Sequence, residues 1–129
     1  MRTDDLEQTT TVQRRTSRVV AGLVAVGLVG VGVAVSQVDH PLADPVGDAL
    51  YAALVFTLLV VVAPRARSAT LALVTVGFCT AIELAQLTGI PAAIVDAVPA
   101  ARYVLGTTFV AVDLLAYAVG AGLAWAVRR

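Results

Sequence analysis

Residues 19–35 read VVAGLVAVGLVGVGVAV, a run of aliphatic residues and glycine without a polar side chain. A helix over this run and its neighbours, rising about 1.5 Å per residue, is long enough to cross a hydrocarbon core of about 30 Å. The run is longer than the apolar part of a cleaved signal peptide, and the polar segment before it is unusually long for one. We therefore expect a transmembrane helix over about 19–37.

Three more apolar runs follow, at 47–63, 69–90 and 107–127, and short segments with proline or charge separate them. Apolar residues make up 59% of the chain and charged residues 14%, against roughly 45–50% and 25% in soluble domains. The sequence predicts an all-α, polytopic membrane protein with four transmembrane helices. We expect residues 1–18 to form a disordered cytoplasmic tail and residues 19–129 to form a single domain.

The basic residues, all of them arginine, predict the orientation. With four spans, one side of the membrane receives all of them except Arg102; these are Arg2, Arg14, Arg15, Arg18, Arg65, Arg67, Arg128 and Arg129. The excess of basic residues on cytoplasmic loops then puts both termini in the cytoplasm and the loops 36–46 and 91–106 outside. We expect a multi-pass protein of the cell membrane.

Acidic residues inside apolar runs need a polar partner, water or a proton, because a charge in lipid is costly. Glu83 near the end of the third run and Asp113 near the start of the fourth lie at one level, about 10 Å below the outer surface. Asp48 opens the second run on the same side, although an acid at a helix start is also explained by capping. With their neighbours one turn away and the outer arginine, the candidate binding site comprises Asp48, Tyr51, Glu83, Gln86, Arg102, Asp113 and Tyr117.

Several functions are compatible with such a site. It could bind membrane lipids by their head groups or a lipid-linked envelope precursor; it could carry protons for transport through Glu83; or its polar residues could only hold helices together. An enzyme is less favoured, because the chain lacks a Ser-His-acid order, an HExxH motif, a phosphate-binding glycine loop and metal-ligand spacing. We expect no cofactor, no metal and no nucleic-acid partner, and a homo-oligomer is left open.

Glycines are concentrated in the first apolar run, at Gly22, Gly27, Gly30 and Gly32. Small residues let membrane helices approach closely, which predicts tight packing of this helix on a neighbour. Simple tolerance of glycine in membrane helices explains them equally well.

Three segments carry a family resemblance: GDALYAALVF at 47–56, CTAIELAQL at 79–87 and VLGTTFVAVDLLAYAVG at 104–120. Together they resemble the small bacterial membrane proteins of domain-of-unknown-function family 2809. The resemblance extends over about 19–127 and implies the four-helix fold, but no activity. It also implies that the family's recurring positions are Asp48, Tyr51, Glu83, Gln86, Gly106, Phe109, Asp113, Tyr117 and Gly120.

A remoter pattern, E-x-x-Q, then arginine, then D-x-x-x-polar-x-x-G, is similar to the VanZ-like proteins. Glu83, Gln86, Arg102, Asp113 and Gly120 match this pattern. The chain departs from it in carrying Tyr117 where those proteins usually carry asparagine, and in a longer segment between Gln86 and Asp113. One VanZ-like protein is associated with teicoplanin resistance, and these departures argue against such a role for this chain. We expect the longer segment to lie at the outer membrane interface as a short amphipathic or re-entrant piece.

Overall fold

The computed structural model of the chain describes residues 2–106 and 111–128, and within these ranges all regular structure is helical. The predicted all-α fold is confirmed. The elements, in chain order, are α1 (Thr3–Ser36), α2 (Ala43–Val62), α3 (Ser68–Gln86), α4 (Ile90–Ala97), the 3₁₀ helix η1 (Pro99–Ala101), α5 (Arg102–Leu105) and α6 (Ala111–Arg128).

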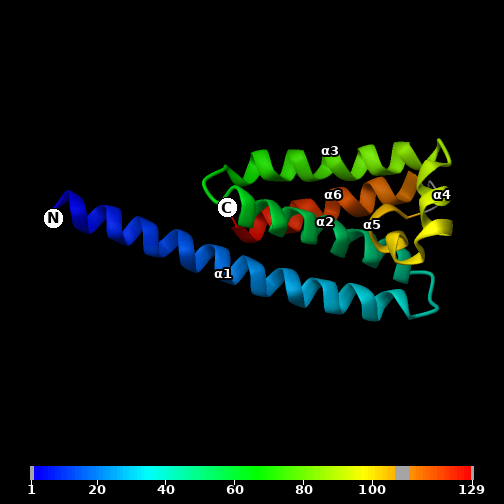
Figure 1. The fold of residues 1–129 in the computed structure, drawn as a ribbon, viewed down its shortest axis with the longest axis horizontal. Coiled ribbons are helices and arrows are strands. Elements are labelled where there is room, and N and C mark those ends of the chain that lie inside the picture. Colours follow the sequence, from blue (N-terminus) through cyan, green and yellow to red (C-terminus); the bar gives the residue numbers. More distant parts are fainter. Residues whose placement is uncertain (1, 107–110, 129) are drawn as a thin grey trace.

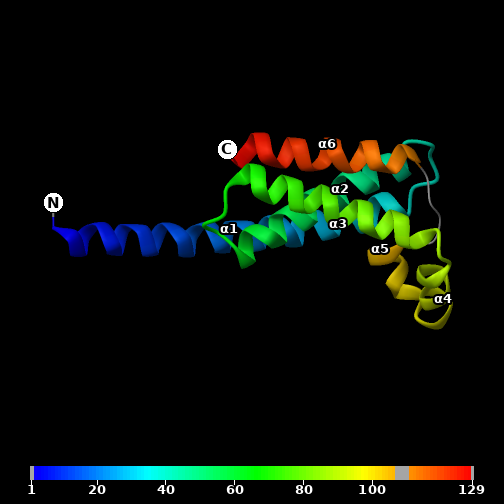
Figure 2. The ribbon, with the colours of Figure 1, turned by 90° about the horizontal axis from the view of Figure 1, so that it is seen from above.

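The four long helices form a bundle in which α2 is central. Helix α2 packs against α1, α6 and α3, and α6 also packs against α3. The short elements α4, η1 and α5 lie together at one end of the bundle, near the connection between α1 and α2 (Figures 1 and 2). The connection between α2 and α3 and the C-terminal end of α6 lie at the opposite end (Figure 1).

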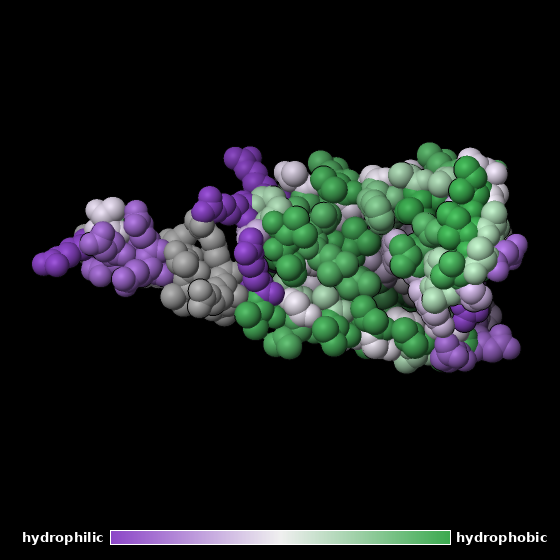
Figure 3. Space-filling view, in the orientation of Figure 1, coloured by the Kyte–Doolittle hydropathy of each residue, from purple (hydrophilic) through white to green (hydrophobic). Residues whose placement is uncertain are grey.

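Three helical segments of the described chain are long and apolar enough to cross a membrane: Arg18–Ser36, Ala43–Val62 and Ser68–Gln86. Their large apolar side chains mostly face outward; Val26 is 73% exposed and Leu73 is 75% exposed. Hydrophobic residues cover the middle of the bundle, and hydrophilic residues gather at its two ends (Figure 3). Such a surface suits lipid rather than water as the solvent. The chain is a multi-pass membrane protein.

The helix bounds differ from the predicted spans at the proline- and glycine-containing ends. Helix α2 begins at Ala43 rather than at residue 47, since Pro45 falls in the first turn, where a proline is tolerated. Asp48 therefore lies inside the helix and does not cap it. Helix α3 ends at Gln86, four residues before the predicted end, and Gly89 turns the chain into α4 with φ of 77°.

The N-terminal residues continue the first transmembrane helix. We expected residues 1–18 to be a disordered tail, whereas the structure has one unbroken helix from Thr3 to Ser36, about 50 Å long. No glycine or proline interrupts residues 2–21, and Asp4 and Asp5 in the first turn favour the helix dipole. The N-terminal part of α1 extends beyond the rest of the bundle (Figures 1 and 2).

Close helix packing occurs at a different glycine from those expected. A Cβ atom added to Gly22, Gly27, Gly30 or Gly32 of α1 would meet nothing within 4 Å. The predicted tight packing of these glycines is therefore wrong within this chain. A Cβ atom on Gly120 of α6 would instead collide with the backbone of Ala49, so α6 and α2 touch backbone to backbone there.

The bundle contains two small clusters of buried side chains. Ala21, Phe56, Val60 and Leu71 form one, and Ala52, Cys79 and Tyr117 form the other. Two buried threonines between the helices donate to carbonyls of their own helices, Thr57 to Ala53 and Thr75 to Leu71. The second cluster adjoins the candidate site, since Tyr117 belongs to both.

Arg128 ties the end of α6 to the connection between α2 and α3. Its guanidinium donates to the carbonyl oxygens of Pro64 at 2.9 Å and Ala66 at 3.0 Å, and to the hydroxyl of Ser68 at 3.1 Å. This contact fixes the bundle at the end opposite α4 and α5.

Candidate functional site

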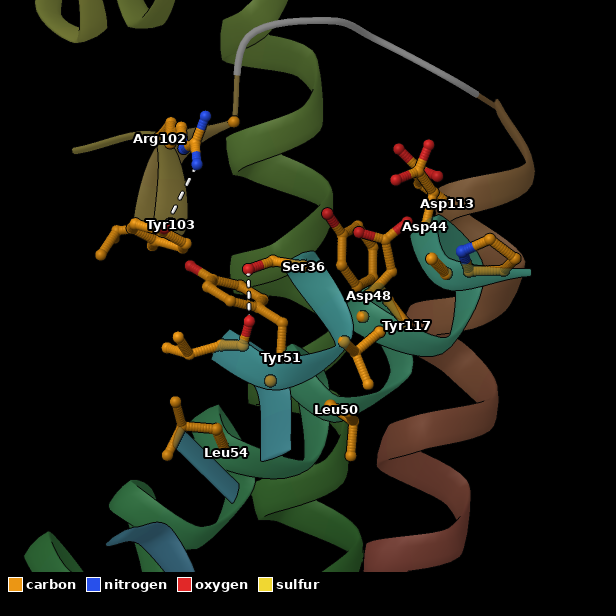
Figure 4. Close-up of a pocket in the computed structure, with 18 of the residues that line it drawn as sticks. Ser36, Asp44, Asp48, Leu50, Tyr51, Leu54, Arg102, Tyr103, Asp113 and Tyr117 are labelled. Carbon is orange, nitrogen blue, oxygen red and sulfur yellow. Dashed lines mark hydrogen bonds between the residues drawn. The ribbon is translucent and has the colours of Figure 1, made fainter. Parts of the chain in front are cut away.

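A cavity of about 820 Å³ opens at the end of the bundle that carries α5 (Figure 4). It lies between α1, α2, α3, α5 and α6, which contribute residues far apart in the sequence. All seven predicted site residues line it: Asp48, Tyr51, Glu83, Gln86, Arg102, Asp113 and Tyr117.

Glu83 is the most deeply buried polar residue of the cavity, with 1% of its surface exposed. Tyr117, itself 5% exposed, donates a 2.6 Å hydrogen bond from its hydroxyl to Oε1 of Glu83. The other carboxyl oxygen, Oε2, is buried and has no hydrogen-bond partner within residues 2–106 and 111–128. A buried acceptor left unpaired costs about 1–3 kcal/mol of stability, so a hydrogen-bond donor supplied to this oxygen would be stabilising.

Gln86, one turn after Glu83, joins α3 to α5. Its Nε2 donates a 2.6 Å hydrogen bond to the carbonyl of Leu105, and its Oε1 is buried without a partner in the described part of the chain. Gly106, which follows Leu105, has φ of 63°, and a Cβ atom there would collide with the Gln86 amide. Glycine is therefore required at this position both by the backbone conformation and by the closeness of Gln86.

Asp48 brings a further acid into the cavity from α2. Its Oδ2 is the third buried oxygen without a partner. Asp113 interacts with it most strongly, and Glu83 and Asp44 also interact with it. Asp44 and Asp113 lie with Asp48 on the same side of the cavity (Figure 4). We did not include Asp44 in the predicted site, although its position one turn before Asp48 puts it on the same helix face.

Two tyrosine rings line the cavity together with the acids. The ring centroids of Tyr51 and Tyr117 lie 6.0 Å apart, with their planes at 55° to each other. This is a common arrangement of packed aromatic rings. The two rings give the polar cavity an aromatic wall.

Arg102 stands on the opposite side of the cavity from the acids (Figure 4). It is exposed, its Nη2 donates to the hydroxyl of Tyr103 at 3.1 Å, and its guanidinium carbon lies 5.0 Å from the centre of the same ring. Arg102 lowers the pKa of Tyr103, with smaller contributions from Ser36 and Gln37 at the end of α1. The sequence spacing did not reveal this pairing, which brings Tyr103 to the cavity beside Arg102.

An apolar part of the cavity wall comes from α1 and α2. Its members are aliphatic side chains and one glycine: Leu28, Val29, Gly32, Val33, Leu50 and Leu54. From Leu28 to Ser36, α1 follows the cavity for about 12 Å along the helix axis. Leu50 and Leu54 lie away from the acids and Arg102, toward the middle of the bundle (Figure 4). The cavity therefore has a polar end and an aliphatic end.

A sequence profile described as "Protein of unknown function (DUF2809)" matches residues 38–121 of the chain. The chain belongs to the DUF2809 family. The match is narrower than the expected 19–127, because it begins after α1 and ends inside α6. No curated protein and no solved structure matched the chain. The similarity to VanZ-like proteins stays a prediction.

The DUF2809 match contains all nine positions that the resemblance implied. Seven of them line the cavity, including Gly106 beside Gln86. Gly120 serves instead at the close approach of α6 to α2. Phe109 lies outside the described residues.

Proposed function

We propose that this DUF2809 protein binds the polar head of an amphiphile, either a membrane lipid or a lipid-linked envelope precursor. The observation that carries the proposal is a set of three buried oxygens that have no hydrogen-bond partner among the described residues; they belong to Asp48, Glu83 and Gln86, which line one cavity. Each has lost its contact with bulk water and has gained no donor from the described residues in return. A bound head group would supply those donors.

The shape of the cavity supports an amphiphile rather than a fully polar ligand. Its volume of about 820 Å³ lies in the range of roughly 300–1,000 Å³ typical of small-molecule sites. The acids and Gln86 occupy the polar end, whereas Leu28, Val29 and Leu54 offer aliphatic contacts. A molecule with a polar head and a hydrocarbon chain satisfies both ends at once.

The proposed orientation puts the cavity at the outer side of the cell membrane. Arg65, Arg67 and Arg128 belong to the end of the bundle opposite α5, together with the α2–α3 connection (Figure 1). The excess of basic residues at that end supports a cytoplasmic location for it. In this proposal α6 is the fourth span, since it packs along α2 and α3 within the bundle, and both termini are cytoplasmic.

Filling the aliphatic end of the cavity tests the proposal without touching an acid. Gly32 lines the cavity, and a side chain added there has open space around its Cβ atom. Native mass spectrometry of the protein released from lipid discs would show a bound lipid in the wild type and its loss in Gly32→Phe. Gly30→Phe is the matched control, because Gly30 is exposed on the same helix, has the same open surroundings and does not line the cavity.

A second candidate is a purely structural membrane subunit, favoured by the buried hydrogen bond from Tyr117 to Glu83. In that case the polar residues would only join α6 to α3. If neither the wild type nor Gly32→Phe retains any lipid after release from the discs, the binding proposal is wrong and the structural role is left.

Proton-linked transport is less supported by the arrangement. Among the described residues, the buried polar side chains between Glu83 and the opposite end of the bundle are Thr75 and Thr57. Both donate to carbonyls of their own helices. Cys79 lies one turn below Glu83 with no exposed surface. These groups do not extend the polar cavity toward the cytoplasmic end.

A further inference from the structure

We propose that the head group held in this cavity carries a primary ammonium group, which is bound at Glu83 and Asp48. This inference rests on the proposed function and names the chemical class of its ligand. It follows from the charges that line the cavity, from the kind of atoms left without partners, and from the position of Arg102.

The charges facing the cavity are unbalanced. Among the described residues, the lining carboxyl side chains are those of the buried Glu83, the half-buried Asp48 and Asp113 and the exposed Asp44, against the single guanidinium of Arg102. That guanidinium is exposed, stacks on Tyr103 and stands across the cavity from the acids (Figure 4). A buried acid such as Glu83 needs a cation or a proton to balance it, and the described residues of the cavity wall supply no cation beside it.

The atoms without partners are all hydrogen-bond acceptors. They are Oδ2 of Asp48, Oε2 of Glu83 and Oε1 of Gln86, all buried, on residues that line the cavity and without a partner in the described part of the chain. Glu83 is 1% exposed and Gln86 8% exposed, so bulk water does not reach these residues freely. A primary ammonium has three N–H donors and no acceptor. It therefore matches this set in both charge and hydrogen-bond sense, which a phosphate or a carboxylate does not.

The neighbouring side chains fit the same ligand. The rings of Tyr51 and Tyr117 line the cavity beside the acids, and aromatic faces attract ammonium ions. Arg102, on the opposite side, is placed to meet an anionic group of the same head. A zwitterionic head with an ammonium and a phosphate thus uses both sides of the cavity, while its acyl chains follow α1.

Competition between two lipids that differ only at the amine tests this assignment. Purified protein in detergent would be mixed with equal amounts of dioleoyl phosphatidylethanolamine and its N-acetylated form, and bound lipid would be counted by native mass spectrometry. We expect the amine lipid to be retained roughly tenfold over the acetylated one, because a charge-assisted hydrogen bond contributes about that ratio. Dioleoyl phosphatidylglycerol, with hydroxyl donors and the same chains, serves as a third competitor.

Glu83→Gln is the informative variant. A glutamine keeps an oxygen that accepts from Tyr117 but presents an amide donor where Glu83 now has a free acceptor. The preference for the amine lipid should fall to near unity in Glu83→Gln and in Asp48→Asn, which supplies a second variant should the first be unstable. Asp96→Asn is the matched control, because Asp96 is an exposed acid at the same end and does not line the cavity.

The outcomes separate the two proposals. Equal retention of the amine and acetylated lipids, or of phosphatidylethanolamine and phosphatidylglycerol, would overturn the ammonium assignment while leaving a lipid-binding cavity. An amine preference that survives both Glu83→Gln and Asp48→Asn would also overturn it. Failure to retain any lipid, in the wild type as in Gly32→Phe, would remove the binding function itself.

Discussion

The hydroxyl of Tyr117 meets the carboxyl group of Glu83 at 2.6 Å, across 34 residues of sequence and inside the bundle. This bond joins α6 to α3 and uses only one of the two carboxyl oxygens. The same pair therefore has two separable consequences: one for the stability of the bundle and one for what the cavity can accept.

Tyr117→Phe should lower the free energy of unfolding by about 1–3 kcal/mol, because both oxygens of the buried Glu83 would then lack a donor. Denaturation in mixed detergent micelles would measure the change. Tyr103→Phe, at an exposed tyrosine, should have little effect. The free energy of unfolding of Glu83→Gln should stay close to that of the wild type, since glutamine retains an acceptor for Tyr117. Equal stability of Tyr117→Phe and the wild type would show that the bond contributes nothing to the fold.

Gly120→Ala should destabilise the bundle because the new methyl group would press on the backbone of Ala49. Overpacking of this kind costs about 1–3 kcal/mol, and here it acts between α2 and α6. Gly122→Ala, two residues away with nothing within 4 Å, is the control and should be neutral. The melting temperature in lipid discs distinguishes them; an unchanged value for Gly120→Ala would contradict the close approach.

Arg128→Met should loosen the connection between α2 and α3 by removing three hydrogen bonds to Pro64, Ala66 and Ser68. We expect backbone amides of this connection, including that of Ala66, to exchange with solvent roughly tenfold faster. Arg65→Met removes an exposed arginine of the same connection and is the control. Exchange as slow as in the wild type would mean that Arg128 does not hold the connection.

Gln86→Leu should release α5 from the end of α3, since the bond from Nε2 to the Leu105 carbonyl is lost. The amide of Gly106, which donates to the carbonyl of Arg102 at 3.0 Å, should exchange faster by roughly tenfold. Gly106→Ala should do the same by displacing the Gln86 amide and by straining a backbone with φ of 63°. Gln8→Leu, at an exposed glutamine near the start of α1, should leave the exchange unchanged.

Single cysteines should report the orientation through a membrane-impermeant maleimide applied to intact cells. Native Cys79 is fully buried and can remain. We expect Asp39→Cys and Asp96→Cys to be labelled directly, and Arg65→Cys and Val127→Cys only after lysis. Val127 is 88% exposed at the end of α6, so its labelling in intact cells would contradict a fourth span.

Much of the helical fold could be predicted from the apolar runs, because a membrane span needs a minimum length of apolar residues. The ends were less predictable. Hydropathy favours continuing α3 to Ile90, whereas the left-handed backbone of Gly89 ends it earlier. The helical start of α1 was missed because polar composition was interpreted as disorder, although nothing between residues 2 and 21 breaks a helix.

The members of the candidate site could be predicted, but their contacts could not. Depth indicated that Glu83 and Asp113 share one level, helical spacing put Gln86 and Tyr117 one turn away on the same faces, and all four line one cavity. Spacing cannot show that Gln86 bonds a carbonyl of α5, or that Arg102 turns to Tyr103 rather than to an acid. Such contacts depend on the path of 87–106, where short helices and turns replace a regular period.

The attachment of α1 has a consequence for how a ligand would reach the cavity. Helix α1 packs against α2 and makes at most isolated contacts with the other helices, yet it supplies much of the aliphatic wall. Tilting α1 away would open a lateral gate between helices while the packing of α6 on α2 and α3 stays intact. A lipid could then enter sideways from its own leaflet, head and chains together, without passing through water.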